Sequence, residues 1–79
     1  MASVPQQPDS ESFSIVFEQE DDGRWLAEVP ELPGVMKYGK TREDAEIAVT
    51  ALALRVLADR TEQARKLPKS IRFLWQMAK

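Results

Sequence analysis

The side chains that most often do chemistry in proteins, histidine and cysteine, are both missing from this chain of 79 residues. Without histidine the usual general acid–base group is absent, and the common zinc-binding sets need histidine or cysteine ligands. A disulfide cannot form either. The sequence therefore predicts a non-catalytic protein with no cofactor and no metal site.

Carboxylates, serines and glycines are the remaining candidates for a reactive site. Asp21 and Asp22 are adjacent in a segment typical of a tight turn, so we interpret them as solvated turn residues. The serines have no histidine to activate them, and nothing singles out a Ser–Lys pair. Gly34 and Gly39 do not make a phosphate loop, because no Gly-rich run with a lysine joins a strand to a helix.

Charge is distributed unevenly along the chain, although the formal net charge is only −2. Acidic residues dominate from Asp9 to Glu31, where Arg24 is the single base, and bases predominate from Lys37 onward. The small negative net charge argues against general nucleic-acid binding. Two interpretations remain: solvated faces of opposite sign, or an acidic surface that speeds the encounter with a basic partner.

The second interpretation predicts a set of contact residues on the acidic side of a hairpin. Buried apolar or aromatic anchors supply most of the energy of an interface, so two such residues join the acids. These two residues are Trp25 and Leu32, although the alternation of residues 25–29 favours a core position for Trp25. The predicted set is Glu18, Glu20, Asp21, Asp22, Trp25, Glu28, Glu31 and Leu32.

Period-two alternation of apolar residues predicts two strands, over residues 13–17 and 25–29. The run 35–38, closed by Gly39, is interpreted as a short third strand. Residues 20–24 predict a hairpin turn, in which Gly23 can take a positive φ without a steric penalty. Pro30 ends the second strand, because proline cannot donate to the sheet. The connections are too short for a crossover, so these strands should form an antiparallel meander.

One long helix is predicted from about residue 42 to residue 62 or 65. Thr41 is a good N-cap, Asp44 suits the first turn, and the segment has no Gly or Pro until Pro68. Residues 69–77 alternate in hydrophobicity and suggest a fourth strand, although a terminal helix accounts for them almost as well.

The predicted helix is apolar on two nearly opposite sides, whereas a surface helix normally hides one stripe. The first stripe consists of Ala45, Ala48, Val49, Leu52 and Val56. The second consists of Ile47, Ala51, Leu54 and Ala58. In so small a chain, either the C-terminal segment or another chain must cover the second stripe, and the latter predicts a homo-oligomer that associates through it.

Residues 1–11 are rich in Pro and Gln and poor in apolar side chains, so we expect a disordered tail before a single domain of residues 12–79. The N-terminus has neither a basic start nor an apolar core, so no signal peptide is predicted. No apolar run approaches the roughly 20 residues that a membrane helix needs. Cytoplasmic residence is the expectation that follows.

The stretch from Phe13 to about Ala58 resembles the N-terminal domain of HicB antitoxins. The resemblance rests on an apolar strand (13–17), an acidic turn (20–23), the run Glu-Val-Pro-Glu-Leu-Pro-Gly (28–34) and Gly-Lys-Thr before the helix (39–41). These motifs are fairly specific in their combined order and spacing. The residue after Leu-Pro-Gly, often Cys in relatives, is Val35 in this chain.

The resemblance implies an α+β fold with a small antiparallel sheet packed on one long helix, in β-β-β-α-β order, similar to a reduced and inactive RNase H fold. It implies no catalysis and, as partner, a small basic ribonuclease toxin of the HicA kind. Full antitoxins often add a C-terminal DNA-binding module, and the residues after Pro68 are too few to form a helix-turn-helix. A stand-alone homo-oligomeric member without a toxin partner is the alternative.

Overall fold

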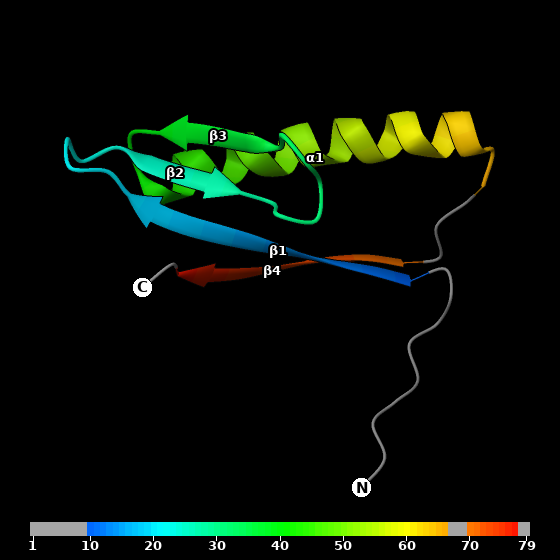
Figure 1. The fold of residues 1–79 in the computed structure, drawn as a ribbon, viewed down its shortest axis with the longest axis horizontal. Helices are drawn as coiled ribbons and strands as arrows, with labels where there is room; N and C mark the ends of the chain where they lie inside the picture. Colours follow the sequence, from blue (N-terminus) through cyan, green and yellow to red (C-terminus); the bar gives the residue numbers. More distant parts are fainter. Residues whose placement is uncertain (1–9, 67–69, 78–79) are drawn as a thin grey trace, which may run out of the picture.

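A computed structural model describes residues 10–66 and 70–77 as one four-stranded sheet with one helix (Figure 1). The elements are β1 (Ser10–Gln19), β2 (Trp25–Glu28), β3 (Met36–Gly39), α1 (Arg42–Ala64) and β4 (Ser70–Met77). The predicted α+β class and the order of the elements along the chain are confirmed. The expected tail lies almost wholly outside the described residues, and β1 begins at Ser10, two residues before the predicted start of the domain.

The sheet is mixed, with the strand order β3-β2-β1-β4. The meander of β1, β2 and β3 is antiparallel as predicted, but β4 runs parallel to β1, from Ser10 opposite Ser70 to Phe17 opposite Met77. The expectation of an antiparallel sheet is therefore wrong for the fourth strand. The reason is that α1 forms a crossover connection, which returns the chain to the end of the sheet where β1 starts.

The strand interpretation of residues 69–77 is confirmed for the described part, since Ser70–Met77 pairs with β1 along its whole length. A strand forms here because alternate side chains face the helix side, where Phe73 packs on Phe13 with 5.7 Å between the ring centroids. A terminal helix would break that alternation.

Helix α1 begins and ends close to the predicted positions. Thr41 is the N-cap, and its Oγ1 accepts a hydrogen bond from the backbone N–H of Asp44 at 3.0 Å. The helix ends where Arg65 takes a left-handed conformation, with φ 55°, and its N–H donates to the carbonyl of Thr61 at 2.8 Å. Pro68 lies outside the described residues.

Replacing Thr41 by alanine should destabilise the protein by about 1 kcal/mol, because the helix start loses the bond that satisfies the Asp44 N–H. Urea unfolding followed by circular dichroism measures this change. The matched control is Thr50→Ala, within α1 and away from its ends, which should stay within about 0.5 kcal/mol of the parent because alanine is the better helix former. Equal effects of the two substitutions would contradict the capping role.

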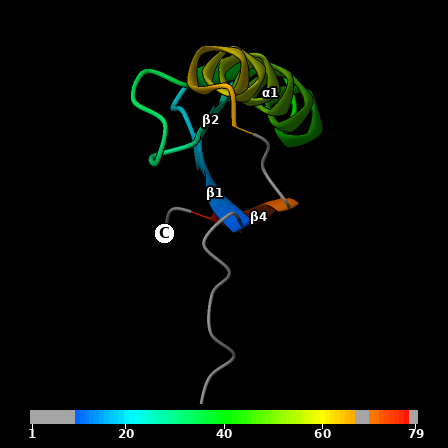
Figure 2. The ribbon, with the colours of Figure 1, turned by 90° about the vertical axis from the view of Figure 1, so that its right-hand side faces the viewer.

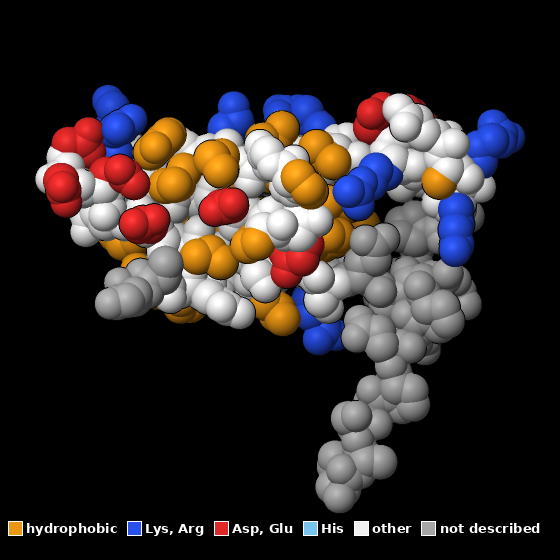
Figure 3. Space-filling view, viewed as in Figure 1, with side chains coloured by type: hydrophobic (Ala, Val, Ile, Leu, Met, Phe, Trp, Pro, Cys, Tyr) orange, Lys and Arg blue, Asp and Glu red, His pale blue; other side chains and the backbone are white. Residues whose placement is uncertain are grey.

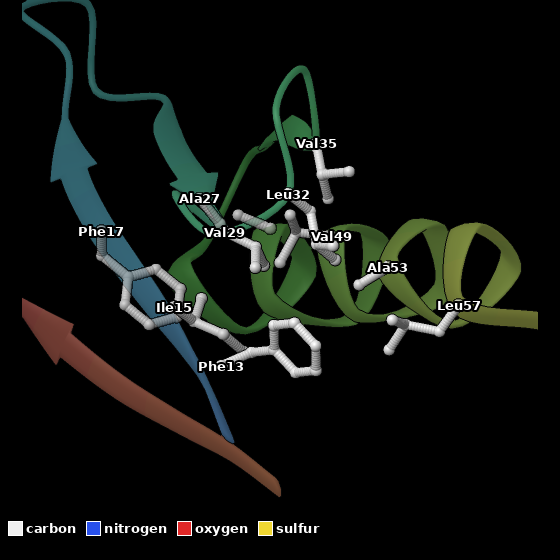
Figure 4. Packing of buried hydrophobic residues seen from close by; sticks show 11 residues of the cluster. Phe13, Ile15, Phe17, Ala27, Val29, Leu32, Val35, Val49, Ala53 and Leu57 are labelled. Carbon is white, nitrogen blue, oxygen red and sulfur yellow. The ribbon is translucent and has the colours of Figure 1, made fainter. Parts of the chain in front are cut away.

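The core lies between the sheet and one side of α1 (Figure 4). From β1 it takes the predicted alternating residues, and from α1 it takes residues four apart. Its members are Phe13, Ile15, Phe17, Ala27, Val29, Leu32, Val35, Ala45, Val49, Ala53 and Leu57. The first predicted stripe of α1 faces this core, with Leu52 and Val56 at its margin, and the structure adds Ala53 and Leu57.

The second predicted stripe of α1 stays at the surface. Ile47 and Leu54 are 61% and 47% exposed, and Ala58 is exposed as well. Strand β4 lies beside β1, at the edge of the sheet away from α1 (Figure 2), so the described C-terminal residues do not cover this stripe.

None of the described helices is long and apolar enough to cross a membrane.

Candidate partner-binding surface

The sheet has one face toward α1 and one open face, and strand alternation decides which side chains lie on each. Phe13, Ile15 and Phe17 of β1 point into the core, so Val16 and Glu18, which alternate with them, lie on the open face. Register places Glu28 opposite Val16 and Leu26 opposite Glu18. Residues directly opposite each other share a face, so β2 contributes these two side chains to the open face.

Strand β3 extends the open face by two exposed side chains. Met36 lies opposite Glu28, and Tyr38 lies opposite Leu26, and they are 43% and 49% exposed. We define the open-face patch as Val16, Glu18, Leu26, Glu28, Met36 and Tyr38.

Carboxylates and apolar groups alternate in this patch. One row across the sheet reads Val16, Glu28, Met36, and the next reads Glu18, Leu26, Tyr38. Figure 3 looks onto this face and shows hydrophobic side chains lying among acidic ones over the strands. A surface of this composition can bind a partner that combines positive charge with apolar contacts.

The hairpin turn between β1 and β2 is ordered by its own acids. The N–H of Glu20 donates to the carbonyl of Arg24 at 2.7 Å, and Gly23 has a φ of 95°, a positive value that glycine can take in this turn. Asp22 accepts from the backbone N–H and the Nε–H of Arg24, at 3.0 and 2.8 Å. These bonds, first the one from the Arg24 backbone, lower the pKa of Asp22 below its usual 3.8.

The Arg24 guanidinium also lies over the Tyr38 ring, 4.4 Å from its centroid. One positive charge is thus held at the edge of the open-face patch, beside the acidic turn. Asp22 is engaged within the turn, whereas Glu18 and Glu28 accept none of the side-chain hydrogen bonds found in the described residues. Glu20 and Asp21 likewise accept none, but they lie at the hairpin turn, so Glu18 and Glu28 are the acids of the predicted set that the open-face patch itself presents.

Glu31 has a structural role that its place in the acidic run of the sequence does not predict. Its carboxylate oxygens accept from the backbone N–H of Ser14 at 3.1 and 3.2 Å. Strand β2 has ended at Glu28, so this side chain takes the place of a strand partner for β1.

Leu32 and Trp25 are not on the open face. Leu32 is 1% exposed, so the expectation that it anchors a partner is wrong. The loop after β2 folds this side chain inward. In that loop the Leu32 N–H donates to the Val29 carbonyl, and the Val35 N–H donates to the Leu32 carbonyl. Trp25 is half-buried on the helix side and packs against the core, which matches the alternative foreseen for it.

Sequence reasoning missed the apolar half of the open-face patch. Met36 and Tyr38 belong to a strand that was predicted. The sequence does not give the register of that strand, so it does not determine on which face of the sheet these two side chains lie. Pairing of β3 with β2 sets that face.

Among the described residues, no group of three or more acidic, histidine or cysteine side chains could hold a metal ion.

A second surface candidate is the outer face of α1, where a shallow depression is lined by Glu43, Glu46, Ile47, Thr50, Ala51 and Leu54. It contains three of the four residues predicted to mediate self-association.

Comparison with protein families, with curated proteins and with solved structures finds no match for this chain.

Proposed function

We propose that this protein is a HicB-like, non-catalytic inhibitor of the antitoxin type, which covers a small basic ribonuclease of the HicA kind with its open-face patch. The observation that carries the proposal is the alternation of Glu18 and Glu28 with exposed Met36 and Tyr38 on one face. The resemblance of residues 13–58 to HicB antitoxins supports the same partner.

Physical chemistry explains why such a face suits a ribonuclease. A protein that holds RNA must present positive charge to phosphates, so its RNA-binding surface is basic. Carboxylates that meet this charge raise the association rate and select the partner. Apolar groups that become buried in the complex supply most of the affinity, and Tyr38 and Met36 fit that role.

The alternative is a stand-alone homo-oligomer of HicB-like fold with no toxin partner. It is favoured by the outer face of α1, where Ile47 and Leu54 stay exposed beside Ala51 and Ala58. In this alternative a second copy covers the stripe, and the open-face patch is solvated.

The test is co-purification of the tagged protein with the product of each neighbouring reading frame, chosen for small size and basic charge. A complex that forms at micromolar concentration and suppresses cleavage of an RNA substrate supports the inhibitor. Failure of all such pairs to associate, with both proteins folded, would reject the inhibitor and leave the homo-oligomer.

Reversing the two patch carboxylates, Glu18→Lys with Glu28→Lys, should slow association with the basic partner by about tenfold or more and flatten its dependence on salt. Stopped-flow mixing at several ionic strengths measures both quantities. The matched control is Asp59→Lys with Glu62→Lys, two exposed acids near the end of α1 with the same total charge change. A control that slows binding equally would show that only net charge matters.

A further inference from the structure

Strand β4 forms an edge of the sheet that is unusually open. It pairs with β1 over eight residues, and no strand of the described chain pairs with its other edge. An unpaired edge presents backbone N–H and C=O groups to any strand that approaches, and proteins usually protect it with charges, proline or short length. The opposite edge, β3, has only four residues and includes Lys37. Strand β4 has twice the length, no proline and Arg72 as its single charge.

Both faces of β4 carry exposed apolar side chains. Trp75 and Met77 are 55% and 50% exposed on the helix side, and Leu74 is 50% exposed on the open face. Helix α1 packs mainly over β2 and β3. In Figure 2, β4 lies on the far side of β1 from the helix, so the sheet extends beyond its cover. Arg42 lies over the Trp75 ring at 4.5 Å and over the Phe17 ring at 5.2 Å, which holds the indole in place.

The sequence of β4 is complementary to itself in one antiparallel register. Two strands related by a twofold axis at Leu74 place Leu74 opposite Leu74, Phe73 opposite Trp75 and Ile71 opposite Met77. Every pair then shares a face, and the pairs join aromatic with aromatic and aliphatic with aliphatic. Arg72 falls opposite Gln76, so no like charges meet.

We propose that β4 pairs antiparallel with β4 of a second copy of this chain, about a twofold axis at Leu74, and joins the two four-stranded sheets into one. The self-complementary register favours this occupant, and the charge of the edge agrees with it. A basic partner would meet Arg72 and no acid along β4, whereas a second copy brings Gln76 to that position. The dimer uses neither the open-face patch nor the outer face of α1, so it does not depend on the inhibitor function.

Cysteine cross-linking tests the register in a chain that has no cysteine of its own. Leu74→Cys places two thiols opposite each other at the axis, and mild oxidation should convert most of the protein to a covalent dimer. Gln76→Cys, on the same face, lies opposite Arg72 and should not cross-link. Leu54→Cys reports on the outer face of α1 and should not cross-link either.

Light scattering of the full chain over a concentration series tests the dimer itself. We expect twice the mass of the chain, and Leu74→Lys should raise the dissociation constant at least tenfold by bringing two ammonium groups together. Leu54→Lys, at a residue of similar exposure, should leave it unchanged. Mixing Leu74→Lys with Leu74→Glu should restore the dimer.

Three results would overturn the proposal. These are a folded parent that stays monomeric at high micromolar concentration, a dimer that Leu54→Lys dissociates and Leu74→Lys does not, and a covalent dimer formed by Leu54→Cys but not by Leu74→Cys. The last two would assign self-association to α1 instead.

Discussion

Truncating Phe17 to alanine should cost about 3–5 kcal/mol, the range for removing a buried aromatic ring. The ring is fully buried in β1, between Ala27 of β2 and Met77 of β4 in the register of the sheet, and it is the largest of the fully buried side chains. A domain of this size has a total stability near the low end of about 5–15 kcal/mol, so the variant should be largely unfolded at about 37 °C.

Urea unfolding at about 25 °C gives the free energy for the parent and the variant. Tyr38→Ala is the matched control, because it removes an aromatic ring from β3 that is 49% exposed and contacts Arg24. It should cost no more than about 1 kcal/mol. Similar losses for both variants would show that the face of β1 that carries Phe17 is not the core.

A methyl group added at Gly39 should be nearly as damaging, with a cost of about 3 kcal/mol or more, the upper end for overpacking. A Cβ at this position would lie 2.9 Å from the Ala45 Cα and from the Asp44 carbonyl carbon, and closer still to the Ala45 nitrogen. These are backbone atoms of the first turn of α1, which cannot rotate away. Strand β3 and the helix would have to separate.

Gly23→Ala is the comparison that isolates this clash. Gly23 has a φ of 95°, but a methyl group added there would meet no other atom within 4 Å, so only backbone strain opposes the change. That strain costs roughly 1–2 kcal/mol. Thermal unfolding should therefore rank the parent above Gly23→Ala and Gly23→Ala above Gly39→Ala. The reverse order of the two variants would place the tight contact at the hairpin instead.

Two parts of the candidate site were predictable to different degrees. The acids Glu18 and Glu28 follow from composition and from the strands that carry them, and both lie on the open face. Leu32 and Glu31 looked equally suitable, because a loop sequence does not reveal which side chain turns inward. Short-range backbone bonds in the loop place Leu32 in the core, and the Ser14 N–H holds the Glu31 carboxylate.

The sequence by itself determined the local structure. Alternation at Phe13, Ile15 and Phe17 and the Thr41 cap depend on neighbours within a few residues, and these predictions match the structure. The tertiary structure decided what depends on distant segments: the parallel pairing of β4 with β1, and the exposure of the second stripe of α1. The physical reason is that strand pairing joins residues sixty positions apart, as between Ser10 and Ser70, and no local pattern records which edge a strand will join.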